Sequence, residues 1–139
     1  MKKRILCLFT ALIMCLSLCA CGRNEAKSSL WDDALYTENT EIGNGEKTLT
    51  VDVVAEEKTV TVTVNTDKDT LGEALMECEL IAGDQGPYGL YVKFVNGIEA
   101  DYDKTQTYWG VTKNGESVMT GVDLEKITDG DKYEFTYTE

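Results

Sequence analysis

The fold is decided by two alternating stretches of sequence, TLTVDV at residues 48–53 and TVTVTV at residues 59–64. In each stretch every second residue is apolar, which is the period of a β-strand with one buried face. Residues 55–58 suit a short connection, so the two stretches are predicted to pair as a β-hairpin. The side chains expected on its buried face are Leu49, Val51, Val53, Val60, Val62 and Val64.

The period changes to that of a helix after this hairpin. Thr70 and Glu73 have the spacing of a capping box, and apolar residues recur at helical intervals from Leu71 to Cys78. Cys78 falls on the apolar stripe, and no cation or base with matching spacing is nearby in sequence to stabilise a thiolate. We therefore predict one amphipathic helix, with Cys78 as a small core residue.

Alternation returns after Gly86-Pro87. Further strands are predicted near residues 90–94, 107–113 and 133–137. They are punctuated by NG at 96–97, NG at 114–115 and DGD at 129–131. Such pairs favour tight turns because they accept positive φ. The order of hairpin, helix and antiparallel strands predicts an α+β domain, β-grasp-like, with one helix packed across a mixed sheet.

The N-terminus has the pattern of a secretory signal. Basic residues at 2–4 precede an apolar run over residues 5–20, which is shorter than the roughly 20 residues that a membrane-spanning helix needs. The run ends in LCAC at residues 18–21, and this resembles the bacterial lipobox. Residues 1–20 are therefore predicted to be a lipoprotein signal peptide and Cys21 to carry the lipid, with an uncleaved anchor as the alternative.

Lipidation would set both the location and the cysteine chemistry. Cys7, Cys15 and Cys19 would leave with the signal peptide, so Cys78 would be alone and no internal disulfide would form. A diacylglyceryl group anchors stably, which places the chain on the extracellular face of a cell membrane, as expected for a Gram-positive bacterium. Loss of three basic residues also changes the net charge from −12 to −15.

The predicted boundaries are residues 1–20 for the signal, 21–46 for the lipidated cysteine with a flexible acidic linker, and 47–139 for one domain. The linker interpretation rests on the GNG breaker at 43–45 and on the lack of a sustained apolar period. The alternative is that Trp31 and Leu35 pack back onto the domain.

The composition excludes several classes of function. The 139-residue chain has no histidine, and 25 acidic residues face 13 basic ones. It therefore has no Ser-His or Cys-His relay and no histidine zinc site, and its charge disfavours nucleic acid. No nucleophile elbow or phosphate loop is present. We expect a monomeric binding protein rather than an enzyme.

Five motifs follow one another in the second half: GPY at 86–88, FVNGI at 94–98, YW at 108–109, NGE at 114–116 and DGD at 129–131. In order and spacing they resemble the transcobalamin-like C-terminal domain family, over residues 60–137. Members of that family occur in bacterial surface proteins and as the β-domain that closes over cobalamin in animal carriers. The resemblance implies a β-grasp-like fold that binds a small flat ligand, with cobalamin as a candidate.

The resemblance also implies which residues would touch the ligand. Tyr108 and Trp109 match the aromatic pair of the family's central strand, and Tyr88 and Tyr91 are further candidates. Exposed aromatic rings suit a planar ligand because they are rigid and apolar, while core packing is the alternative for all four. The animal carriers enclose cobalamin with a helical barrel that this sequence does not contain, so we expect weak binding, binding together with a partner chain, or loss of the binding activity.

Two other functions remain open. Asp101 and Asp103 alternate beside a turn, and Asp129 and Asp131 flank Gly130, so oxygen ligands suited to Ca²⁺ would converge if these loops met. Solvated acidic side chains are the alternative there. A module that contacts a surface protein or a glycan would use the same exposed aromatic residues.

Overall fold

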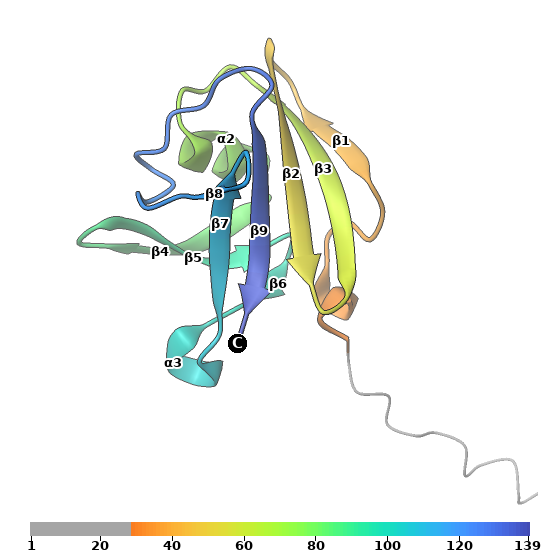
Figure 1. Cartoon of the computed structure of the whole chain (residues 1–139), viewed down its shortest axis with the longest axis vertical. Helices are drawn as coiled ribbons and strands as arrows, with labels where there is room; N and C mark the ends of the chain where they lie inside the picture. The colour runs from red at the N-terminus through yellow and green to blue at the C-terminus, as the bar shows by residue number, and fades with distance from the viewer. Residues whose placement is uncertain (1–28) are drawn as a thin grey trace, which may run out of the picture.

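The computed structural model describes residues 29–139, so the predicted signal peptide and Cys21 lie outside the described residues (Figure 1). In chain order the elements are the 3-10 helix η1 (Leu30–Asp33), strands β1 (Thr40–Gly43), β2 (Lys47–Ala55) and β3 (Lys58–Thr66), helix α2 (Leu71–Glu77), strands β4 (Ile81–Gly86), β5 (Gly89–Val95) and β6 (Ile98–Glu99), helix α3 (Tyr102–Thr105), and strands β7 (Tyr108–Lys113), β8 (Glu116–Ser117) and β9 (Lys132–Thr138). None of the helices described is long and apolar enough to cross a membrane.

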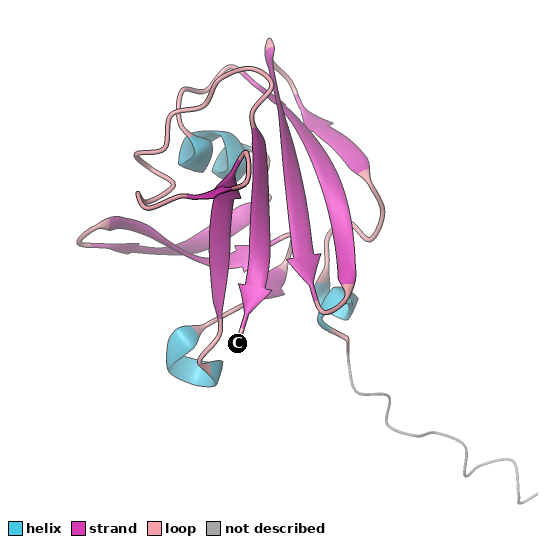
Figure 2. Cartoon of the chain, in the orientation of Figure 1, coloured by secondary structure: helices cyan, strands magenta, loops and turns pink. Residues whose placement is uncertain are grey.

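The strands form two sheets, and the α+β class is confirmed. A six-stranded sheet has the order β1-β3-β2-β9-β7-β8, and β4-β5-β6 form a smaller one. The β2–β3 hairpin pairs antiparallel as predicted, while β9 lies parallel to β2 and antiparallel to β7. This insertion of the last strand beside the first long one is the β-grasp arrangement. The sequence did not indicate that β4, β5 and β6 would leave the main sheet as a separate hairpin layer (Figure 2).

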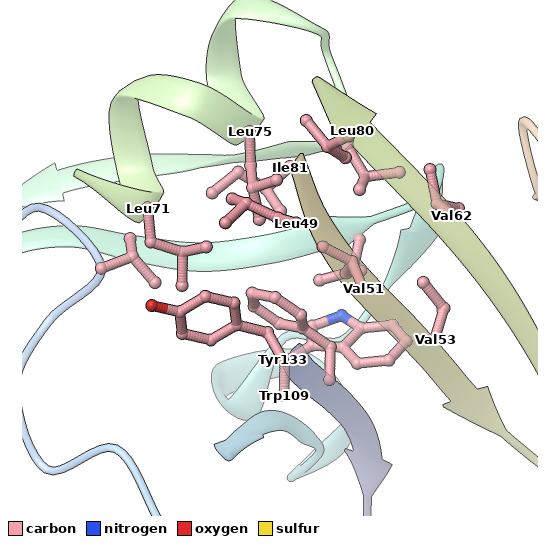
Figure 3. Close-up of a cluster of buried hydrophobic side chains, with 14 of the residues drawn as sticks. Leu49, Val51, Val53, Val62, Leu71, Leu75, Leu80, Ile81, Trp109 and Tyr133 are labelled. Atoms are coloured by element: carbon pink, nitrogen blue, oxygen red, sulfur yellow. The ribbon is translucent and has the colours of Figure 1, made fainter. Parts of the chain in front are cut away.

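The core lies on one face of the six-stranded sheet. All six alternating residues of the hairpin are at most 1% exposed, as the sequence predicted. Leu71 and Leu75 of α2 point down onto this face, toward Leu49 and Tyr133 (Figure 3). Burying each such side chain stabilises the fold by about 1.5–3 kcal/mol. Helix and hairpin therefore hold each other in place.

Helix α2 begins with one of the two hydrogen bonds of the predicted capping box. The Thr70 Oγ1 accepts a hydrogen bond from the Glu73 N–H at 3.3 Å. At the other end the Cys78 thiol donates to the Leu75 carbonyl at 3.5 Å and is half-buried. Burial raises the pKa of the Cys78 thiol above its ordinary value, so it stays protonated near neutral pH and packs against the core.

The linker interpretation of residues 22–46 is wrong for residues 29–46, which we call the N-terminal strap. Trp31 is only 8% exposed, its indole N–H donates to the Ala55 carbonyl at 3.0 Å, and the Lys58 ammonium lies 4.7 Å from its ring centroid. Strand β1 extends the main sheet by pairing parallel with β3. The strap is part of the domain, although Leu35 is exposed. The alternative interpretation, in which this apolar segment packs back onto the domain, therefore holds for Trp31.

The Asn96-Gly97 turn fixes the strap from the other side. Both residues have positive φ, as the NG pair predicted. The fully buried Asn96 amide accepts from the Tyr36 N–H at 2.9 Å and donates to the Tyr36 carbonyl at 2.8 Å, as a neighbouring strand would. A Cβ at position 97 would lie 2.5 Å from the Asp33 carbonyl oxygen. Only glycine allows so close an approach.

Candidate functional site

An open groove of about 790 Å³ lies beside β7. Figure 1 shows the elements around it, with the β4–β5 hairpin protruding to one side of β7 and α3 below that strand. Its lining comes from β5, α3, β7 and the segment 118–122 that follows β8. The lining residues are Leu90, Tyr91, Val92, Tyr102, Asp103, Tyr108, Trp109, Gly110, Val111, Val118, Thr120, Gly121 and Val122. The groove is therefore a concave, mainly apolar surface of the size that small ligands occupy.

Four aromatic side chains line this groove. Trp109 is 7% exposed and belongs to the core as well as to the groove lining, so it joins the two. Tyr91 is 43% exposed, and Tyr108 and Tyr102 are exposed too. The structure thus brings together three of the four aromatic residues predicted from sequence. The fourth ring, Tyr102, was not predicted because it lies in the short helix α3, whose sequence has no helical apolar period.

Tyr88, the remaining aromatic residue predicted to bind a ligand, does not line the groove. It is 93% exposed at the turn between β4 and β5 and is not among the lining residues. The Gly86-Pro87 turn directs its ring into solvent. Because Tyr88 is aromatic and solvent-exposed but outside the groove, it serves as a matched control for Tyr108.

Part of β7 offers a free backbone edge to the groove. On one side β7 pairs with β9 along its whole length, but on the other side β8 pairs only with Thr112 and Lys113. Residues 108–110 thus have no strand partner on that side among the described residues. A free strand edge presents unpaired N–H and C=O groups. A ligand lying in the groove would find amide hydrogen-bonding groups there as well as aromatic rings.

The indole of Trp109 carries an unusual feature. Its Nε1 is the only buried side-chain polar atom without a hydrogen-bond partner in the part of the chain that the structure describes. The Tyr137 ring packs against Trp109 in a T-shaped arrangement with the centroids 5.5 Å apart. An unpaired buried donor costs about 1–3 kcal/mol. The indole N–H of Trp109 thus lacks the hydrogen bond that a buried polar group normally makes.

The four aspartates predicted as an alternative metal site are not brought together. Asp101 and Asp103 lie at the start of α3, near the first residue of β7. Asp129 and Asp131 precede β9 and lie near the last residue of β7, at the opposite end of that strand. The Asp129 carboxylate accepts from the Thr48 N–H at 2.7 Å, and that of Asp131 from the Thr128 N–H at 2.8 Å. Within residues 29–139 no group of three acidic or cysteine side chains is placed to hold a metal ion. This donor set does not fit a metal.

Asp101 has a structural role. Its Oδ1 accepts the Asp103 N–H at 3.0 Å, which caps α3, and its Oδ2 lies 3.4 Å from the Lys93 ammonium. Burial alone would raise the pKa of Asp101, but the bonds from Lys93 and Asp103 hold that pKa below its usual value. The Lys93 pKa is raised, chiefly by its contact with Asp84 at 2.7 Å. Lys93 of β5 thus links Asp84 of β4 with Asp101 at the start of α3.

Solved structures show the class of domain to which this fold belongs. A structure of haptocorrin in complex with Cbi superposes with a TM-score of 0.54 at 16% identity. The match covers 67% of this chain and 25% of haptocorrin. At this identity the likeness concerns the fold alone, and it establishes a transcobalamin-like fold.

A family model and a more similar solved structure identify the family of this chain. Residues 68–139, more than half of the chain, match the family described as domain of unknown function DUF4430. A protein from Ruminococcus gnavus ATCC 29149, described as a candidate metal binding protein, is 38% identical with a TM-score of 0.63, over 68% of this chain and 98% of that one. The chain therefore belongs to the DUF4430 family. Comparison with curated proteins gives no match.

Proposed function

We propose that this chain binds a small planar molecule in the groove beside β7. The observation that carries the proposal is the meeting of four aromatic rings from three separate elements around one open groove of about 790 Å³. Buried aromatic contact supplies most of the affinity in such sites, and the free edge of β7 supplies amide hydrogen bonds. The function proposed is binding, without chemical conversion of the ligand.

A corrinoid is the ligand we propose to test first. Corrinoids are flat, apolar on their faces and fringed with amides, which suits aromatic rings beside a free strand edge. The Cbi complex of haptocorrin, whose domain shares this fold, supports the choice. Because the groove covers only one side of such a ligand, we expect a dissociation constant of about 1–100 µM rather than tight binding.

Calorimetric titration of the full chain in detergent micelles with cobinamide and cyanocobalamin tests the proposal. We expect saturable binding that weakens about tenfold in Tyr108→Leu, since this removes one stacking face. Tyr88→Leu removes a ring that is even more exposed but lies outside the groove, and it should leave the affinity unchanged. No binding of either corrinoid at hundreds of micromolar, or equal effects of the two variants, would contradict the proposal.

We further propose that the domain acts as a lipoprotein on the outer face of the cell membrane. The support is the LCAC sequence at residues 18–21 after the apolar run. Cells grown with an alkyne analogue of palmitate should label the chain, and Cys21→Ser should abolish the label. Cys19→Ser is the matched control and should keep it. Labelling that follows Cys19 instead would move the cleavage site.

A further inference from the structure

We propose that the groove selects ligands that carry a positive charge, such as a protonated or quaternary amine beside an apolar planar group. This inference rests on the proposed function, because it specifies the class of ligand for the same groove. It comes from the charges and rings of the lining rather than from the shape of the groove.

The lining of the groove is electrostatically one-sided. Its 13 residues include no lysine or arginine and a single acid, Asp103. The neighbouring acid Asp101 is bridged to Lys93 and Lys104, but no ion pair among residues 29–139 involves the Asp103 carboxylate. Asp103 is exposed and follows Tyr102 directly on α3. The groove therefore offers one uncompensated negative charge next to an aromatic ring.

The lysine beside the Tyr91 ring and the lysine that follows Asp103 already have carboxylate partners. The Lys93 ammonium is 5.9 Å from the Tyr91 ring centroid, but it lies between Asp84 at 2.7 Å and Asp101 at 3.4 Å. The Lys104 ammonium contacts Glu99 at 2.9 Å and Asp101 at 3.9 Å. Together with Asp103, four carboxylates thus face two ammonium groups. An anionic ligand would meet repulsion here, and a cationic one attraction.

The aromatic rings add a second attraction. Among residues 29–139, three rings already have an ammonium over their faces: Lys58 over Trp31, Lys93 over Tyr91 and Lys113 over Tyr133. Within the described residues no such cation covers Tyr102 or Tyr108, and both rings are exposed in the groove. A cation near a tyrosine face is favoured by the ring quadrupole. Tyr102, Asp103 and Tyr108 therefore form the surface that would select a cation.

Three fluorescent probes that share one planar group test the inference: trimethyl(pyrenylmethyl)ammonium, neutral pyrenemethanol and anionic pyrenesulfonate. Each is titrated into the full chain in neutral detergent at low salt. The cation should bind about tenfold more tightly than the neutral probe, because one carboxylate and two exposed rings each contribute modestly. The anion should bind most weakly. In Asp103→Asn the preference for the cationic over the neutral probe should fall from about tenfold to about threefold.

The overall negative charge of the chain needs its own control. Glu57→Gln removes the same charge from the exposed β2–β3 turn, outside the groove lining, and should leave the preference unchanged. Equal affinity for all three probes would overturn the charge selection while leaving the proposed groove intact. Equal losses in Asp103→Asn and Glu57→Gln would overturn it too, since the effect would be non-specific. Binding of no probe and no corrinoid would overturn both.

Discussion

The two tryptophans of this chain are buried to almost the same extent, yet they do different things. Trp31 is 8% exposed and Trp109 is 7% exposed. Trp31 donates its N–H to Ala55 and lies under the Lys58 ammonium, so every group it carries is used. The Trp109 N–H has no partner, and its ring borders an open groove. The difference separates a residue that closes the fold from one that we propose contacts a ligand.

The largest effect is expected from Trp31→Ala, on the free energy of unfolding. Removing this side chain leaves a cavity under the β2–β3 turn and frees the N-terminal strap, at a cost of about 3–5 kcal/mol. Urea unfolding of the full chain in micelles, followed by circular dichroism, measures this loss. Probe binding below the unfolding transition should be unchanged, since Trp31 does not line the groove. A loss under 1 kcal/mol would show that the strap is only loosely attached.

For Trp109→Phe we expect a small loss of stability and a clear loss of affinity for the probe. A smaller ring keeps the apolar contact and removes the unpaired N–H, so the free energy of unfolding should fall by no more than about 1–2 kcal/mol. The affinity for the planar probe should fall about tenfold, because the lining loses half of its indole face. A stability loss as large as that of Trp31→Ala, with unchanged affinity, would make Trp109 an ordinary core residue.

The comparison also shows what the sequence reveals. The alternation in β2 and β3, the spacing in α2 and the NG turns are local patterns, and all were predicted. Trp31 was assigned to a linker because its contacts with Ala55 and the strap's contacts with Asn96 span 24 and 60 residues. Tyr91, Tyr108 and Trp109 were found through a family resemblance, whereas Tyr102 enters the groove only through the placement of α3. Tyr88 belongs to the GPY motif but does not line the groove, so the motif alone did not indicate which aromatic residues come together.

Acid should destabilise the fold through the ion pairs of Asp101 with Lys93 and of Asp131 with Lys113. The pKa values of Asp101 and Asp131 are below the ordinary 3.8, so their contribution to stability is present above that pH and is lost as the pH falls through the lower folded-state values. With no histidine in the chain, stability should be flat from about pH 6 to 8. Urea unfolding at pH 3 and pH 7 should show a smaller acid loss in Asp101→Asn than in the parent. An equal loss would remove Asp101 from this account.

Addition of calcium should have the smallest effect of these changes on the stability of the protein. The predicted metal ligands lie at opposite ends of β7 and are engaged with lysines or backbone N–H groups, apart from Asp103. Millimolar calcium and EDTA should therefore leave the melting temperature of the full chain unchanged. A rise of several degrees with calcium, abolished in Asp103→Asn but not in Glu57→Gln, would contradict this and would favour metal binding at α3.

The most direct test of the groove follows the two indole N–H signals by ¹H–¹⁵N NMR during a titration with trimethyl(pyrenylmethyl)ammonium. Trp31→Phe assigns the two signals, and each tryptophan then acts as the other's control. We predict that the Trp109 signal shifts progressively and saturates, while the Trp31 signal, held by its bond to Ala55, stays in place. Equal shifts of both signals, or a shift of Trp31 alone, would contradict a binding groove beside β7.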